Sequence, residues 1–127
     1  MKLFLYAMAG GALGSGTRHL LNIGIGRLTG ASGFPWWTFG INVTGCFLMG
    51  ALIELLALRF NGSTDLRTFL ATGVLGGYTT FSAFSLDFLT LMSRQDYTAA
   101  ASYVIGSVVL SLLGVYAGLW LIRTLLA

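Results

Sequence analysis

Four long apolar segments alternate with three short polar joints along the chain. The segments cover residues 3–26, 36–58, 69–92 and 99–122, and the joints read RLTGASGFPW, RFNGSTDLR and SRQDYT. A helix needs about 20 apolar residues to cross the hydrocarbon core of a bilayer. It also satisfies its backbone hydrogen bonds internally, which lipid requires. The pattern predicts an all-α membrane protein in which residues 1–127 form one domain of four transmembrane helices.

The ends of the predicted helices carry residues typical of such ends. Pro35 lies in the first joint, where it does not interrupt a helix. Trp36, Trp37 and Trp120 lie near segment ends, as in the aromatic belts at membrane surfaces. The first segment continues past a plausible signal-peptide cleavage point and three more segments follow it, so we expect it to be retained.

Composition indicates a protein surrounded by lipid. Apolar residues make up 56% of the 127 residues and charged residues 9%, whereas a soluble domain carries about 25% charge. The net charge of +3 comes from basic residues scattered at segment ends, so no nucleic-acid partner is expected. One cysteine and one histidine offer neither a disulfide nor a metal-ligand cluster. The sequence has no Ser-His-Asp, Cys-His or phosphate-loop pattern, so an enzyme is not expected.

Charge at the two predicted membrane faces shows only a weak bias. With four crossings, both termini and the second joint share one side, which holds Lys2, Arg59, Arg67 and Arg123. The opposite side holds two or three basic residues, among them Arg27 and Arg94. Two interpretations stay open: cytoplasmic termini, which the count slightly favours, or insertion in both orientations and pairing as an inverted dimer.

Small residues recur at the spacing that lets membrane helices approach closely. Three segments contain such GxxxG pairs: Gly10 with Gly14, Gly73 with Gly77, and Gly114 with Gly118. Four helices of a 13.5 kDa chain enclose little space by themselves. We therefore expect the chain to oligomerise.

Polar side chains inside the first two segments need an explanation. Arg18 is a candidate functional residue because charge is unfavourable inside a membrane; alternatively, it extends to the lipid headgroups. Thr38 and Asn42 share a helix face. Asn42 either faces a water-filled path or only bonds a neighbouring helix. Glu54 lies one turn from its segment end and is expected to reach the membrane surface.

The fourth segment carries hydroxyl groups in phase. Tyr103, Ser107 and Ser111 recur every four residues, which places their hydroxyls about 6 Å apart along one helix face. Each hydroxyl can donate or accept a hydrogen bond. A serine in a membrane helix often bonds its own backbone instead. Three hydroxyls in phase favour a polar path over that alternative.

The third segment contains the stretch GGYTTFSAFS, residues 76–85. Its glycines, with Gly73 before them, each lower helix propensity by about 1 kcal/mol relative to alanine. We expect a break in the third helix here, because freed carbonyls inside a membrane commonly coordinate ions. Phe81 and Phe84 fall on one face, and their positively polarised ring edges can contact an anion. The alternative is that both rings are ordinary core.

These motifs together resemble one known family. GGALGSGTR, TFGINVTGCFLMG, TGVLGGYTTFSAFS and the Tyr-Ser-Ser stripe are similar to the Fluc (CrcB) fluoride channel family over nearly the whole chain. The resemblance implies a passive fluoride channel of the bacterial inner membrane. It also implies an antiparallel, dual-topology homodimer with two pores, each lined by both subunits.

The resemblance also implies roles for particular residues. A central structural sodium ion (Na+) would be held by the backbone carbonyls of Gly76 and Thr79. The fluoride pore would be lined by Asn42, Phe81, Phe84, Tyr103, Ser107 and Ser111, with Thr38 near it. Arg18 matches the arginine of the family's first helix. Asp87 stands where the family often has glutamate, which keeps the charge at the pore vestibule but shortens its reach.

Two other functions fit four short membrane helices. A small exporter of organic cations, also an inverted dimer, needs a membrane-embedded acid to exchange protons. The first segment has no Asp or Glu, and Glu54 and Asp87 lie towards segment ends. An assembly subunit without transport would need neither phased hydroxyls nor a weakened third helix.

Overall fold

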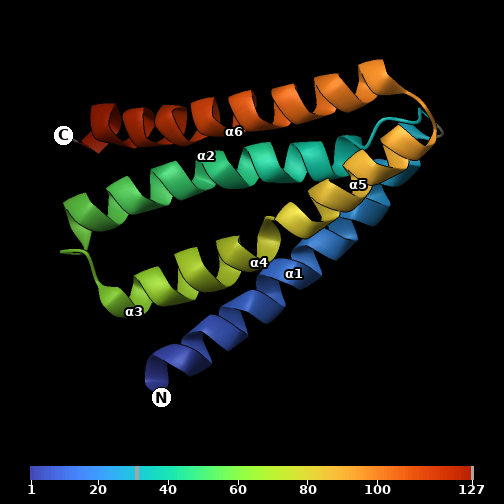
Figure 1. Ribbon diagram of the computed structural model, residues 1–127. Helices are drawn as coiled ribbons and strands as arrows, with labels where there is room; N and C mark the ends of the chain where they lie inside the picture. Colours follow the sequence, from blue (N-terminus) through green and yellow to red (C-terminus); the bar gives the residue numbers. More distant parts are fainter. Residues whose placement is uncertain (31, 127) are drawn as a thin grey trace.

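The computed structural model describes residues 1–30 and 32–126, which fold into helices with no strand among them. The elements in chain order are α1 (Lys2–Thr29), α2 (Trp36–Arg59), α3 (Thr64–Arg67), η1 (Thr68–Leu75), α4 (Gly76–Tyr78), α5 (Phe81–Ser93) and α6 (Tyr97–Leu126). The run from α3 to α5 forms one pass, so the chain makes four helical passes (Figure 1). Each pass covers one predicted apolar segment and extends it by no more than five residues at either end.

Two helices are long and apolar enough to cross a membrane. Within the described residues these are α2 and α6, with mean hydropathies of 1.9 and 2.1. Little of either helix is covered by the rest of the chain, since 28% of the apolar window of α2 and 11% of that of α6 is buried. Large apolar side chains therefore face outward, and lipid or another chain must cover them.

The passes associate in two pairs. Helices α2 and α6 run side by side, and α1 lies along η1 and α4 (Figure 1). Glycine makes both contacts close. A Cβ at Gly50 would collide with the Val115 carbonyl, and one at Gly14 with the Val74 carbonyl. Small residues thus bring helix backbones together within one chain, as such residues do in membrane bundles.

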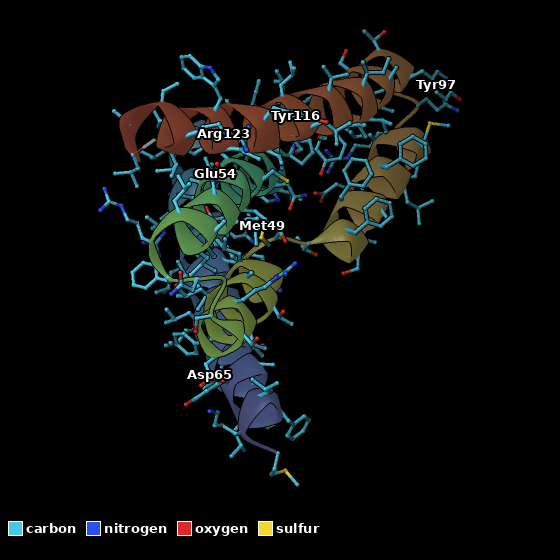
Figure 2. All side chains as sticks on the ribbon, turned by 90° about the vertical axis from the view of Figure 1, so that its left-hand side faces the viewer. Met49, Glu54, Asp65, Tyr97, Tyr116 and Arg123 are labelled. Carbon is cyan, nitrogen blue, oxygen red and sulfur yellow. The ribbon has the colours of Figure 1, made fainter. Side chains whose placement is uncertain are left out.

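The third pass is interrupted after α4. The helix ends at Tyr78, and Thr79 (ψ 159°) and Thr80 (φ −153°) have extended backbone before α5 begins at Phe81. The Thr80 hydroxyl caps α5 by accepting a hydrogen bond from the Ala83 N–H at 3.1 Å. Figure 2 shows α5 turning away from α4 towards the start of α6.

The N-terminal end of α1 is tied to the start of the third pass. Lys2 Nζ lies 2.6 Å from Asp65 Oδ2, and Ser63 caps α3 by accepting from the Leu66 N–H at 3.4 Å. The pKa of Lys2 is raised, chiefly by its hydrogen bond to Asp65 and secondly by the negative charge of Asp65. Because both side chains are exposed, the contact orients the helix end more than it stabilises the fold.

Candidate functional site

A cavity of about 240 Å³ opens beside the interruption of the third pass. Helices α2, α5 and α6 and the extended residues between α4 and α5 supply its lining, which consists of Asn42, Cys46, Thr79, Thr80, Phe81, Phe84, Ser107, Val108 and Ser111. The polar groups of this lining are hydroxyls, one thiol, one amide and backbone, without a formal charge. Six of these residues are among the sequence-predicted site residues.

Asn42 bonds both backbone polar groups of Thr80. Its Nδ2 donates to the Thr80 carbonyl at 2.9 Å, and its Oδ1 accepts from the Thr80 N–H at 2.8 Å. In a continuous helix that N–H would donate to the Gly76 carbonyl. The asparagine therefore pairs both backbone groups of Thr80 across the interruption. Its Nδ2 carries a second N–H, which bonds no acceptor among the described residues.

Arg18 reaches the same interruption from α1. Its Nη1 donates to the Thr79 carbonyl at 3.1 Å, while the Thr79 N–H and hydroxyl both donate to the Leu75 carbonyl at 3.0 Å. The Arg18 guanidinium is thus hydrogen-bonded to a main-chain carbonyl of the third pass. Its hydrogen bond places a cationic donor beside the cavity, against a residue that lines it.

The aromatic rings of α5 form a stack with α6. The ring centroids of Phe81 and Phe84 are 5.4 Å apart with planes tilted by 37°, and Phe84 lies 5.1 Å from Tyr103. Phe84 packs against the core cluster around Tyr103, whereas Phe81 is 78% exposed. One of the two rings is therefore partly core, and the other projects from the chain at the cavity rim.

The hydroxyl stripe of α6 divides into two parts. Ser107 and Ser111 line the cavity. Ser107 is only 5% exposed, and its Oγ finds no hydrogen-bond partner within residues 1–30 and 32–126. Tyr103 is fully buried and its hydroxyl donates to Asp87 Oδ2 at 2.9 Å. Tyr103 does not line the cavity, and neither does Thr38, which is buried on α2.

Asp87 lies between Tyr103 and a second cavity of about 310 Å³. This cavity is lined by Gly30, Gly33, Pro35, Trp37, Asp87, Thr90, Leu91 and Arg94. Its residues come from the first joint, the start of α2, the second half of α5 and Arg94 just after it, so it lies at one end of the bundle. The acid thus connects this end cavity to the α6 stripe through a single hydrogen bond.

Backbone carbonyls are the groups here that can hold a cation. Within the described residues no three His, Cys, Asp or Glu side chains group together as metal ligands. The Gly76 carbonyl loses the Thr80 N–H to Asn42. The Thr79 carbonyl accepts one bond from Arg18 and keeps a second lone pair. Hard cations bind such oxygen atoms.

The position of Glu54 differs from the one that the sequence predicts. We expected this acid to reach the membrane surface, but it is only 8% exposed. Its carboxylate accepts from Arg123 Nε at 2.8 Å and Arg123 Nη2 at 3.2 Å, and Figure 2 shows the two side chains meeting between α2 and α6. The partner lies 69 residues away, so no local pattern could reveal the pair.

Three lining residues were not predicted: Cys46, Thr80 and Val108. Cys46 follows Asn42 by one helical turn, so the spacing held a usable signal for it. Thr80 enters the lining because the helix breaks at this residue and not at the glycines before it. Val108 follows Ser107 directly, and nothing in the stripe pointed to it.

The helical fold, the outward-facing apolar side chains and the small cavity with a few uncharged polar groups define a helical membrane protein with room for a small solute. Residues 5–119 match the model of the family described as "CrcB-like protein, Camphor Resistance (CrcB)". The chain therefore belongs to the CrcB family, which confirms the resemblance found in its motifs.

Curated relatives match the chain over nearly its full length. It is 53% identical over 124 residues to a protein of Paracoccus denitrificans, covering 98% of this chain and 97% of the relative. It is 50% identical over 117 residues to one of a Chelativorans strain, covering 92% and 93%. It is 49% identical over 127 residues to one of Rhodospirillum centenum, covering 100% of both. Each is named "Fluoride-specific ion channel FluC".

Proposed function

We propose that this protein is a passive, fluoride-selective channel that releases fluoride from the cytoplasm. The relatives that match nearly all of the chain carry the name of a fluoride-specific channel. They are channels, which confirms the expectation that the chain is not an enzyme. The organic-cation exporter is not supported, because Glu54 is bonded to Arg123 and Asp87 to Tyr103, and the relatives are named as fluoride channels.

One observation in the cavity carries the proposal: the buried hydroxyl of Ser107, which has no hydrogen-bond partner among residues 1–30 and 32–126. A buried polar group without a partner is unfavourable by about 1–3 kcal/mol, so such a group in a native fold has a reason to persist. A small anion in the cavity would accept the hydrogen bond that Ser107 lacks. Together, Ser107, Ser111 and the second N–H of Asn42 offer donors at successive positions.

The uncharged lining suits conduction of a strongly hydrated ion. Burying a small anion without replacing its water is highly unfavourable, and donor groups can replace that water in steps. Conduction also requires sites weak enough for the ion to leave. Hydroxyls, an amide and the ring edges of Phe81 and Phe84 bind an anion less tightly than a fixed cation in the cavity would.

The working unit in this proposal is an antiparallel homodimer with two pores, inserted in the inner membrane with four crossings per chain. Phe81 projects from the cavity rim with 78% of its surface exposed, so one chain leaves the rim open and a second copy can close it. The weak charge bias between the two membrane faces is compatible with insertion in both orientations.

A structural sodium ion at the dimer centre completes the proposal. The residues present fit it, because the carbonyl of Gly76 lacks its helical donor and that of Thr79 keeps a free lone pair. Two carbonyls from each chain would give an all-oxygen site of the kind that hard cations prefer. When bound, the ion supplies positive potential that favours an anion nearby.

A fluoride efflux assay tests the proposed function. Purified protein is reconstituted in liposomes loaded with potassium fluoride, and valinomycin dissipates the membrane potential while an electrode records external fluoride. We expect rapid fluoride release and no release of chloride from matched vesicles. Protein vesicles that release fluoride no faster than protein-free vesicles, or that release chloride equally fast, would contradict the proposal.

A further inference from the structure

Cys46 places a thiol in the wall of the cavity. It is the single cysteine of the chain, and its side chain is partly exposed. It stands one helical turn beyond Asn42, on the same face of α2, and shares the cavity lining with Ser107. The Ser107 hydroxyl is buried without a partner in the part of the chain that the structure describes, so a hydrogen-bond donor without an acceptor belongs to the same lining as the thiol.

We propose that Cys46 is a modification site for small thiol-reactive compounds, and that a group attached to its sulfur closes the path. This inference rests on the proposed channel function, because closure needs a conducting cavity. The reagents that fit are small thiosulfonates, which transfer an alkylthio group to sulfur, and soft metal cations such as mercury(II). Soft metals prefer thiolate to the hydroxyl, amide and carbonyl groups around them.

The chemistry is a simple exchange at sulfur. The Cys46 thiol gives its proton to water, and the thiolate attacks the sulfenyl sulfur of methyl methanethiosulfonate. A new S–S bond forms to the methylthio group, the S–S bond of the reagent breaks, and methanesulfinate leaves with the electron pair. Mercury(II) chloride reacts in a parallel way, because the sulfur binds mercury as one chloride and the thiol proton are released.

Closure follows from the place of Cys46 in the cavity. Its volume is about 240 Å³, and it is lined by Cys46 on one helix and by Ser107 and Ser111 on another. A methylthio group on Sγ lies beside the donors that would replace the water of the ion. The added group is apolar and supplies no donor, so a dehydrated anion has no substitute for its water at that position.

The test combines mass spectrometry with fluoride efflux on the same samples. Folded protein in detergent is treated with methyl methanethiosulfonate, and its mass is measured before reconstitution. We expect one methylthio group per chain, fluoride release reduced to that of protein-free vesicles, and recovery of release after dithiothreitol. The Cys46→Ser variant, compared with its own untreated flux, should gain no mass and lose no flux.

A second pair of variants tests the location without using flux. Ser107→Leu fills the space beside Cys46 and should slow modification of the folded protein, whereas Ser102→Leu, on an exposed position of the same helix, should not. Modification with full fluoride release overturns the inference, as does a thiol that reacts only after denaturation. If the Ser107→Leu variant does not fold, the flux measurements decide instead. The inference is overturned if treatment reduces fluoride release by the Cys46→Ser variant as much as it reduces release by the wild-type protein. If the untreated protein releases no fluoride, the result counts against the proposed channel function. The modification rates of the two leucine variants still test whether Cys46 lies in the cavity beside Ser107.

Discussion

The side-chain amide of Asn42 holds the extended backbone of Thr80 at two points, 2.9 Å and 2.8 Å from its carbonyl and its N–H. The amide takes the place of the helical hydrogen bond that the interruption removes. The same side chain lines the cavity. Its position thus links the break in the third pass to the proposed ion path.

Asn42→Ala should reduce both stability and conduction. The change leaves the N–H and carbonyl of the half-buried Thr80 without their partner, which is unfavourable by up to about 1–3 kcal/mol, the range for a fully buried group. We expect a lower unfolding temperature in detergent and fluoride release near the protein-free level. Asn22→Ala is the matched control, because Asn22 lies on α1 and does not line the cavity. Equal effects of the two changes would contradict the role given to Asn42.

Phe81→Ile should slow fluoride release without preventing assembly. Isoleucine keeps the apolar bulk but removes the polarised ring edge that would contact the anion. A barrier higher by about 1.4 kcal/mol slows release about tenfold, and we expect a loss of that order. Phe88→Ile, on an exposed position of the same helix, serves as control. Wild-type release by the Phe81 variant would remove the ring edges from the mechanism.

Ser107→Ala should change stability and conduction in opposite directions. The buried hydroxyl finds no partner among the residues that the structure describes, so its removal should leave the unfolding free energy equal or raise it by about 1 kcal/mol. Fluoride release should fall because the path loses a donor. Size-exclusion chromatography, thermal unfolding and efflux on one preparation make the comparison. A variant that is less stable but conducts fully would assign Ser107 to packing alone.

Arg123→Gln should destabilise the pairing of α2 with α6 but leave selectivity intact. It leaves the Glu54 carboxylate, whose side chain is 10% exposed, without its cationic partner. We expect a lower unfolding temperature, with recovery in the double variant Glu54→Gln/Arg123→Gln. Neither residue lines the cavity, so the ratio of fluoride to chloride release should not change. A changed ratio would show that this ion pair acts on the path.

Removing sodium should weaken the assembly. A ligand that binds only the folded dimer raises its apparent stability with concentration. We expect the unfolding temperature to rise as sodium is titrated into protein prepared in N-methylglucamine buffer, and potassium at equal ionic strength to give a smaller rise. If the unfolding temperature depends identically on sodium and potassium concentration, the proposal of a central sodium ion is wrong. The fluoride efflux result does not depend on this outcome.

The sequence predicted the positions of the four helical passes better than the contacts between them. The apolar segments gave helix positions to within a few residues, because hydrophobic periodicity and end signals are local properties. Arg18 and Asn42 were singled out because polar groups inside apolar segments need partners. Their partners, Thr79 and Thr80, were not predicted as such, because each lies on another pass and depends on how the glycine faces of α1 and η1 meet.

By itself the sequence determined which segments are helical, which residues are polar within them, and the family to which the chain belongs. Only the tertiary structure decided that Ser107 and Ser111 face the cavity while Tyr103 turns to Asp87, and that Glu54 is buried against Arg123. The reason is physical. Periodicity describes one helix at a time, whereas the environment of each side chain depends on helices that approach from distant parts of the chain.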